Sequence, residues 1–287
     1  MENILRIAVQ KSGRLSDDSL KLFKECGIKF SDAGKGRLKT TARNFPVEFL
    51  FLRDDDIPGY VEDGVADLGI VGENEMAEQA KDITIVRRLG FSKCRLSLAL
   101  PRGTEYRGIQ QFEGLSIATS YPNILEGYLK TKGVTADIHE ISGSVEIAPG
   151  IGLADAVCDI VSSGSTLLMN GLQEVETIFR SEAVLIGPHT LAPEKQTLVE
   201  QLVFRMNAVS AAGSNKYILL NAPNDKLEAI TQLLPGMRSP TILPLAQSDW
   251  SSVHSVIKED DFWEVIDKLR ANGAEGILVV PIEKMIL

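Results

Sequence analysis

A run of small, hydroxyl-bearing residues, Ser162-Ser-Gly-Ser-Thr166, directly follows an apolar stretch that predicts a buried strand over 156–161. We expect a helix to begin at this run. Backbone N–H groups and hydroxyls at such a strand-to-helix turn can bind a terminal phosphate, and the helix N-terminus adds a positive dipole end. Gly164 lets the backbone come close. Hydrogen bonds to a charged group contribute about 1.5–3 kcal/mol each, so a few could hold a phosphate without a lysine.

Asp159 lies in the predicted strand just before this run. A carboxylate in that place can accept hydrogen bonds from vicinal ribose hydroxyls, which suits a neighbouring 5′-phosphate site. The alternative is an ordinary Ser/Gly turn that caps a helix. Taken alone, the five residues of the run favour this simpler interpretation.

Two cations, Lys11 and Arg14, occupy the loop after the first predicted strand, with Gly13 between them. Ligands of open α/β sheets bind at the carboxyl ends of the strands, where such a loop lies. The alternative is a solvated basic loop without a ligand. Arg53 and Arg95 also stand near strand ends, where an arginine is often only an ion-pair partner.

The composition limits the classes of function. The chain has 287 residues, 44% hydrophobic and 24% charged, which predicts a globular protein of two or three domains. A net charge of −9 argues against a nucleic-acid binder, which would show a basic face. Three scattered cysteines and three scattered histidines predict reduced thiols and no zinc site. Without a signal-peptide pattern or an apolar run of about 18 residues, we expect a soluble, cytoplasmic protein away from membranes.

Strand-like apolar runs alternate with amphipathic helical segments, which predicts an α/β body with parallel sheets flanked by helices. After a linker expected at 211–215, the order becomes strand, helix, strand, strand, helix, strand, a ferredoxin-like βαββαβ unit over 213–287. Topology alone fits a regulatory domain and an oligomerisation domain equally. The expected strands of this unit cover 216–221, 241–245, 252–257 and 276–281, and its helices 225–234 and 262–272.

One long stretch resembles the signature of the ATP phosphoribosyltransferase family. The matching spacing is Glu146–Gly152–Ala154–Val157–Asp159–Ile160–Ser163-Gly164–Thr166-Leu167. Other stretches resemble motifs of this family in the same order: QKSGRLSDDS (10–19), RDDDIPGYVEDGVADLGIVGEN (53–74), CRLSLALP (94–101), ATSYPN (118–123), SPTILPL (239–245) and ILVVPIEKM (277–285). The resemblance covers the C-terminal domain that the short form of the family lacks. Departures are small: Ser163 stands where threonine is frequent, and 74–90 is compact.

This resemblance implies a fold and a domain division. The fold is a two-lobed, periplasmic-binding-protein-like body, called type IV among phosphoribosyltransferases, followed by the regulatory βαββαβ domain. Lobe I would comprise 1–94 and 181–212, lobe II would comprise 95–180, and the regulatory domain would comprise 213–287.

The family transfers the phosphoribosyl group of phosphoribosyl pyrophosphate to N1 of ATP, releasing pyrophosphate, at the start of histidine biosynthesis. The resemblance places Lys11 and Arg14 as catalytic residues at the departing pyrophosphate. The implied phosphoribosyl pyrophosphate contacts are Asp159, Ser162, Ser163, Gly164, Ser165, Thr166 and Leu167. The implied ATP contacts are Lys11, Gly13, Arg14, Glu73, Asn74 and Tyr121, where Tyr121 could stack on a ring or serve only for packing.

Mg²⁺ is the implied cofactor, and it usually arrives on phosphates and water with one or two protein carboxylates. Asp54 and Asp55 are the candidate carboxylates, with Asp56 beside them. The alternative is that these residues only cap the helix that begins near Pro58. Both interpretations stay open at this stage.

Regulation by L-histidine is implied for the C-terminal domain, with Asn221, Thr241 and Gly276 as candidate contacts. Asn221 replaces an acidic residue found in some members, which leaves the contact to the ammonium group undefined. The family also implies a homo-oligomer, a hexamer or a dimer, and allows AMP as a second inhibitor. Two other classes of function compete with the enzyme: a cytosolic small-molecule sensor and a non-catalytic regulatory partner, whose phosphate loop should be degraded.

Overall fold

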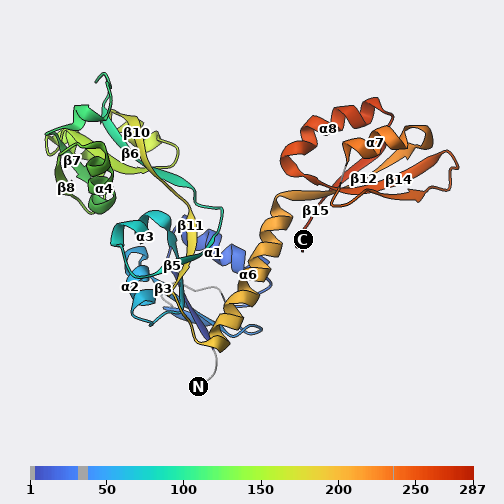
Figure 1. Ribbon diagram of the computed structural model, residues 1–287, viewed down its shortest axis with the longest axis horizontal. Coiled ribbons are helices and arrows are strands. Elements are labelled where there is room, and N and C mark those ends of the chain that lie inside the picture. The colour runs from blue at the N-terminus through green and yellow to red at the C-terminus, as the bar shows by residue number, and fades with distance from the viewer. Residues whose placement is uncertain (1–3, 32–37, 235) are drawn as a thin grey trace. The chain divides into compact units, whose positions relative to one another are not determined.

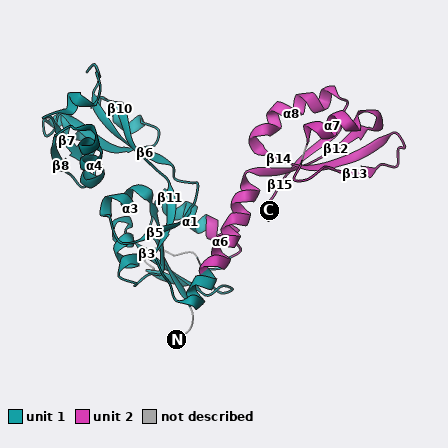
Figure 2. Cartoon of the chain, in the orientation of Figure 1, with its two compact units in different colours: residues 1–21, 28–198 teal, residues 22–27, 199–287 magenta. Residues whose placement is uncertain are grey.

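The computed structural model describes residues 4–31, 38–234 and 236–287. The chain divides into two compact units, Met1–Lys21 with Ile28–Leu198, and Leu22–Gly27 with Val199–Leu287 (Figure 2). The first unit contains two lobes, each built around one sheet (Figure 1). The second unit contains a smaller sheet with two helices and most of the long helix that precedes it.

Lobe I is built on a six-stranded sheet in the order β2-β3-β1-β4-β11-β5. Its strands are β1 (Leu5–Gln10), β2 (Lys39–Thr41), β3 (Val47–Leu52), β4 (Leu68–Gly72), β5 (Thr84–Arg88) and β11 (Ala183–Gly187). Its helical elements are α1 (Arg14–Glu25), η1 (Asp54–Asp56), α2 (Ile57–Glu62) and α3 (Glu73–Gln79). A Cβ on Gly69 of β4 would lie 2.5 Å from the Ile57 side chain, so glycine is required for α2 to pack on this sheet.

Lobe II is built on a five-stranded sheet in the order β10-β6-β9-β7-β8. Its strands are β6 (Cys94–Pro101), β7 (Ser116–Thr119), β8 (Asp137–Glu140), β9 (Ala156–Val161) and β10 (Leu172–Ser181). Its helical elements are η2 (Ile109–Phe112), α4 (Pro122–Lys132), η3 (Val145–Ile147), η4 (Pro149–Ile151) and α5 (Ser165–Met169). A core that includes Leu98, Phe112 and Leu125 lies between sheet and helices.

The expectation of parallel sheets was confirmed only in part, because both sheets are mixed and β7 pairs parallel with β8 and β9 whereas other strands pair antiparallel. β1 runs parallel to β3 and β4, but β11 pairs antiparallel with β4 and β5. In lobe II, β6 pairs antiparallel with both β9 and β10. The chain leaves lobe I after β5 and returns along β10 into β11 without a helical crossover, and such a connection reverses the strand direction.

The C-terminal unit confirms the predicted βαββαβ order. It consists of β12 (Asn215–Pro223), η5 (Asn224–Lys226), α7 (Leu227–Leu233), β13 (Thr241–Pro244), β14 (Trp250–Lys258), α8 (Glu259–Ala271) and β15 (Glu275–Pro281). The antiparallel sheet has the order β13-β14-β12-β15. Ile218, Leu220 and Leu269 are buried in its core.

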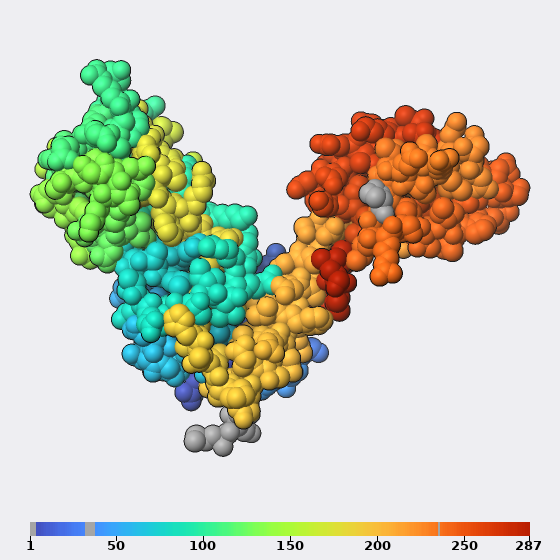
Figure 3. Space-filling view, viewed as in Figure 1, coloured from blue at the N-terminus to red at the C-terminus, as the bar shows by residue number. Residues whose placement is uncertain are grey.

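The linker expected at 211–215 was also wrong. Helix α6 (Pro193–Gly213) continues to within one residue of β12. The Asn215 Nδ2 donates to the Ala211 carbonyl at 2.7 Å, so a side chain just past the helix satisfies one of its last carbonyls. The C-terminal residues lie along the same helix, where Met285 N donates to Ala208 O at 2.9 Å (Figure 3).

Among the described residues, no helix has the length and apolar character that a membrane span requires.

Candidate active site

The predicted phosphate run forms the turn between β9 and α5. Gly164 has φ +81° at the N-cap position of α5, a conformation that favours glycine. A Cβ there would meet only Val161, at 3.8 Å, so the backbone angle and not space requires the glycine. The Ser163 Oγ and the Ser165 Oγ lie 2.9 Å apart, and Ser165 N donates to Ser163 Oγ at 3.4 Å. The turn therefore presents preorganised hydroxyls at the end of a strand.

The turn is held by a buried leucine and by an arginine of a neighbouring strand. Ser162, Ser163, Ser165 and Thr166 are exposed, whereas Leu167 is buried in a cluster beneath them. Beside the turn, Arg95 of β6 donates to both carboxylate oxygens of Glu174 on β10, and its Nη1 donates to Ser162 O at 3.3 Å. This pairing holds the pKa of Glu174 below its usual value.

Asp159 precedes the turn on β9, in register opposite Ser97 of β6. Burial raises the pKa of Asp159, and the charge of Glu146 adds to this increase. Ile160 N donates to the Asp159 Oδ1 at 2.7 Å, which partly offsets the effect. One oxygen is thereby held by the backbone, and this fixes the carboxylate beside the phosphate turn.

Tyr121 lies at the junction of the two lobes and is hydrogen-bonded to lobe I. Its hydroxyl donates to the Glu75 Oε1 at 3.0 Å and accepts from the Asn74 Nδ2 at 3.2 Å. Burial raises the pKa of Tyr121, and the charges of Glu75 and Asp159 raise it further. The predicted residues Asn74, Tyr121 and Asp159 thus lie in one neighbourhood.

Asn74 is the centre of this junction, with 5% of its surface exposed. Ser181 Oγ donates to the Asn74 Oδ1 at 2.7 Å, and Asn74 N donates to Ser181 Oγ at 3.1 Å. A Cβ on Gly72 would lie 2.3 Å from the Asn74 Oδ1, so the glycine makes room for the amide. Glu73 points elsewhere: its Oε1 accepts from the Arg88 Nη2 at 2.6 Å.

The basic loop between β1 and α1 is open. Lys11, Ser12, Gly13 and Arg14 are all exposed, and Gly13 has φ +98°. Lys11 N donates to Leu52 O at 2.7 Å, which ties the backbone to β3. The Arg14 Nε lies 3.9 Å from the Asp18 Oδ2, with 79% of the arginine side chain exposed. Among the described residues, neither cation is neutralised by a buried partner, so both can meet an anionic ligand.

The three aspartates form the short turn η1 after β3. Asp54 accepts from the Gln10 Nε2 at 3.2 Å, and Asp55 pairs with Arg53 at 2.9 Å. Asp56, the N-cap residue of α2, makes no capping hydrogen bond with its side chain, so the capping interpretation was wrong for it. Within the described ranges, no group of three or more His, Cys, Asp or Glu residues could hold a metal ion. Asp54 and Asp55 fit a metal that brings its other ligands on phosphates.

The three candidate regulatory residues lie on one face of the C-terminal sheet. Asn221 alternates along β12 with buried Leu220 and Ala222, so it points to the face that the helices leave open. Thr241 of β13 lies opposite His254 of β14, and His254 lies opposite Leu219 of β12. Leu219 is two residues from Asn221, so Thr241 and Asn221 share one face of the sheet. Gly276 has φ +59°, and a Cβ there would lie 3.3 Å from the Asn221 Nδ2.

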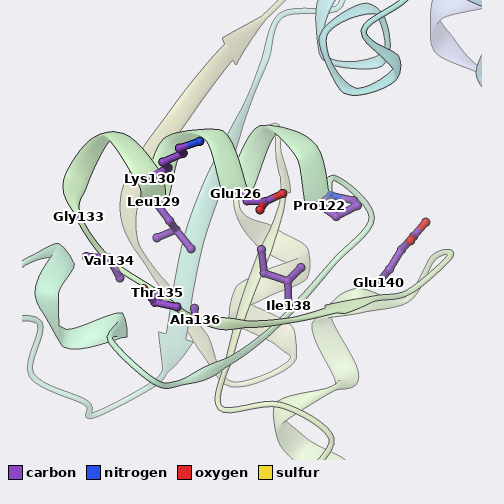
Figure 4. Close-up of a pocket in the computed structure, with 10 residues that line it drawn as sticks. All are labelled: Pro122, Glu126, Leu129, Lys130, Gly133, Val134, Thr135, Ala136, Ile138 and Glu140. Atoms are coloured by element: carbon purple, nitrogen blue, oxygen red, sulfur yellow. The ribbon is translucent and has the colours of Figure 1, made fainter.

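A separate open hollow of about 700 Å³ lies between α4 and the edge strand β8 (Figure 4). Glu126 and Lys130 of α4 and Glu140 of β8 are among its lining residues. One cation against two carboxylates makes it a poor site for an anionic substrate, so the phosphate turn remains the better candidate.

Comparisons with known proteins agree with this geometry. A family model described as ATP phosphoribosyltransferase matches residues 53–208. The chain belongs to the ATP phosphoribosyltransferase family. A second model, the HisG C-terminal domain, matches residues 212–284, which indicates the long form.

Relatives of the same name cover the whole chain. The chain is 60% identical over 286 residues to the ATP phosphoribosyltransferase of Cytophaga hutchinsonii, with 100% of both chains covered. It is 60% identical over 284 residues to that of Bacteroides fragilis, covering 99% of this chain and 100% of the relative. It is therefore an enzyme, a phosphoribosyltransferase of histidine biosynthesis, rather than a passive sensor or a non-catalytic partner.

Solved structures support the two-lobed fold. A chain of the ATP phosphoribosyl transferase (HisG:HisZ) complex from Thermotoga maritima matches with a TM-score of 0.60 at 28% identity, over 71% of this chain and 99% of that one. The probable extracellular-binding protein ytmK of an amino-acid ABC transporter from Bacillus subtilis matches with a TM-score of 0.50 at 12% identity, over 73% and 93% of the two chains. The second likeness concerns the fold alone.

Sequence reasoning missed the residues that hold the site together. Glu75, Glu78, Glu174 and Gln10 contact partners 44 or more positions away in the chain. Nothing local distinguishes them from solvated polar residues. The only sequence signal is that Glu75 and Glu78 are three residues apart and so share a helix face.

Proposed function

We propose that Asp159 and residues 162–167 bind the phosphoribosyl part of phosphoribosyl pyrophosphate. The observation that carries this proposal is the turn itself, with a glycine at positive φ and exposed hydroxyls ordered above a buried leucine. The 5′-phosphate would take the N–H and hydroxyl donors of the turn. The Asp159 carboxylate, which two residues of β9 separate from the turn, would accept from the ribose hydroxyls.

In the reaction, the N1 lone pair of ATP forms a bond to C1 of the ribose. The C1–O bond to pyrophosphate breaks, and its electron pair leaves with pyrophosphate. Because N1 already carries a lone pair, no side chain need remove a proton. Catalysis then consists of alignment, which can be worth roughly 7–11 kcal/mol, and neutralisation of the departing anion. Lys11 and Arg14 are the proposed catalytic residues because both are exposed cations in the loop that contains Gly13.

For ATP, we propose contacts from Lys11, Gly13, Arg14 and Tyr121, with Asn74 orienting the Tyr121 hydroxyl. The hydrogen bond of 3.2 Å from Asn74 to Tyr121 supports this division of roles. Glu73 stays a predicted ATP contact, and to reach a ligand its carboxylate would have to leave Arg88.

We propose Mg²⁺ as the metal and Asp54 with Asp55 as its protein ligands. When bound, the metal would offset the charge of the pyrophosphate group. The chain's own contribution is to hold two neighbouring carboxylates after β3, one of them oriented by the Gln10 amide.

A substitution at the phosphate turn tests the main proposal. Thr166→Ala should raise the Kd of phosphoribosyl pyrophosphate about tenfold, the equivalent of one charge-assisted hydrogen bond. Thr131→Ala is the matched control, because Thr131 is an exposed residue of lobe II whose Oγ1 donates to the Tyr128 carbonyl of its own helix. Calorimetric titration measures both variants. An unchanged Kd for Thr166→Ala would place the phosphate elsewhere.

We further propose that L-histidine inhibits the enzyme by binding the open sheet face at Asn221, Thr241 and Gly276. The shared face and the short approach of Gly276 to the Asn221 amide support a small polar site there. Removing residues 213–287 should abolish the inhibition.

A point substitution tests this site in the full chain. Thr241→Val should raise the inhibitory histidine concentration about fivefold, since one hydroxyl bond is worth about 1 kcal/mol. Thr231→Val, on an exposed part of α7, is the control. Equal inhibition of the two variants would contradict the site.

We also propose that the enzyme works in the cytoplasm as a homo-oligomer, a hexamer or a dimer. Exposed apolar side chains on β13 and β15, among them Leu243, Leu278 and Val280, support the assembly because a subunit contact would cover them. Light scattering on the purified chain would give the subunit number, and a monomer at assay concentration would contradict the proposal.

A further inference from the structure

Helix α4 of lobe II is capped by a carboxylate that comes from lobe I. Glu78, near the end of α3, has 9% of its surface exposed. Its Oε1 accepts from Asn123 N at 2.8 Å, and its Oε2 accepts from Ile124 N at 3.0 Å. In return, the Asn123 Nδ2 donates to the Glu78 carbonyl at 2.9 Å.

This arrangement satisfies the start of α4 completely. The first N–H groups of a helix have no partner within it. Pro122 has no N–H, Leu125 N donates to Tyr121 O, and Glu78 takes the two that remain. Tyr121, the N-cap residue, contributes no side-chain cap, so the remote carboxylate performs that role.

The capped turn is the one that carries Tyr121. Glu75, one helical turn before Glu78, accepts from the Tyr121 hydroxyl, so α3 holds this residue by its side chain and by the helix that follows it. The backbone of Tyr121 is also tied to Thr119, through N to Oγ1 at 2.9 Å. The position of the Tyr121 ring therefore depends on two carboxylates of the opposite lobe.

We propose that Glu78 is a positioning residue for the nucleotide. By capping α4 from lobe I, it sets the place of Tyr121 at the lobe junction and so the fit of the adenine. This inference rests on the proposed contact between Tyr121 and ATP. The phosphate turn itself is fixed by Arg95 and Leu167, so we expect binding of phosphoribosyl pyrophosphate to depend on Glu78 much less than binding of ATP does.

Glu78→Gln is the first test. Its amide retains one acceptor but presents N–H groups to a backbone N–H, which removes one of the two bonds and leaves the other with a neutral acceptor. We expect the KM for ATP to rise about tenfold, while kcat and the KM for phosphoribosyl pyrophosphate change less than about twofold. Glu113→Gln is the matched control, because the Glu113 Oε2 accepts from Thr135 N at 2.8 Å entirely within lobe II.

A double-mutant cycle with Tyr121→Ala separates positioning from a structural role. If Glu78 acts through Tyr121, Glu78→Gln changes the KM for ATP by less than about twofold once the ring is absent. The proposal would be overturned if Glu78→Gln raised the KM for ATP by the same factor with and without Tyr121. It would also be overturned if Glu113→Gln raised this KM as much as Glu78→Gln does. If instead Tyr121 does not contact ATP, the single substitution Tyr121→Ala would leave the KM for ATP unchanged.

Asn123→Ala provides a second route if Glu78→Gln folds poorly. It removes the return bond to the Glu78 carbonyl from the lobe II side and leaves the carboxylate in place. The KM for ATP should rise about two- to threefold, again only when Tyr121 is present. An unchanged KM for ATP, in a variant that melts at the parent temperature, would overturn the proposal.

Discussion

The phosphate turn at 162–167 and the basic loop at 11–14 both follow strands, yet they are built in opposite ways. The turn carries no cation of its own. Arg95 contacts its Ser162 carbonyl, two of its hydroxyls contact each other, and its Leu167 is buried in an apolar cluster. The loop carries two exposed cations, and its described contacts include a backbone bond from Lys11 to β3 and the pairing of Arg14 with Asp18.

This difference indicates two ways in which a chain with a net charge of −9 can bind anions. The ordered N–H and hydroxyl groups of the turn can hold a phosphate in one orientation, because they need no rearrangement when the ligand arrives. Where further negative charge develops as pyrophosphate departs, the exposed cations of the loop can stabilise it. We therefore expect the turn to govern binding and the loop to govern turnover.

The largest expected effect is on the loop. The double substitution Lys11→Ala with Arg14→Ala should lower kcat about 10²- to 10³-fold, the range for removing transition-state charge stabilisation. The KM for phosphoribosyl pyrophosphate should change much less. Initial rates across substrate concentrations measure both, with Lys130→Ala as a control cation on α4. A large rise in KM with kcat unchanged would reverse the roles of the two regions.

Asp159→Asn should produce the next largest effect, a rise of about 10- to 100-fold in the KM for phosphoribosyl pyrophosphate. Burial raises the pKa of Asp159, so the charged form is disfavoured in the folded protein. The neutral variant should therefore melt at or above the parent temperature at pH 8. Thermal unfolding beside the kinetics checks this, and a lower melting temperature would make Asp159 a structural residue.

Arg95→Lys should have a smaller effect, a rise of about fivefold in the KM for phosphoribosyl pyrophosphate with little change in kcat. Lysine keeps the charge but loses the two-pronged contact with Glu174 and the reach to the Ser162 carbonyl. Steady-state kinetics with phosphoribosyl pyrophosphate varied would detect it. If KM is unchanged, the turn is ordered without its side support.

The smallest effect concerns pH. The pKa of Glu174 is lowered by its bonds to Arg95, so this carboxylate adds stability above its unfolded pKa of about 4.3 and loses it as pH falls through the folded value. Between pH 6 and 3, Arg95→Lys should therefore lose less stability than the parent. Denaturant unfolding at several pH values measures the free energy of unfolding of both proteins. An equal loss in the parent and in Arg95→Lys would contradict the prediction.

The sequence predicted what local patterns encode. The Ser/Gly turn, the strand with Asp159 and the βαββαβ order all follow from neighbouring residues, and the structure has them in place. It predicted poorly what depends on distant contacts. The expectation of parallel sheets failed for the antiparallel strands because their pairing is set by tertiary contacts. The linker at 211–215 was wrong because α6 continues to Gly213, where the nearby Asn215 side chain caps its last turn.

The roles of Glu75 and Glu78 were likewise beyond local patterns. Their partners, Tyr121 and the start of α4, lie more than 40 residues away. A glutamate on a short acidic helix has the same local pattern whether it faces water or a second lobe.

The most direct test of the account is an ultraviolet absorbance assay for the N1-substituted adenine product. The purified full chain is mixed with ATP, phosphoribosyl pyrophosphate, Mg²⁺ and pyrophosphatase, with and without L-histidine. The account predicts turnover that histidine suppresses. Turnover without suppression would leave the C-terminal unit with an assembly role alone. No turnover, with both substrates still bound, would contradict the central claim that these two loops form a catalytic site.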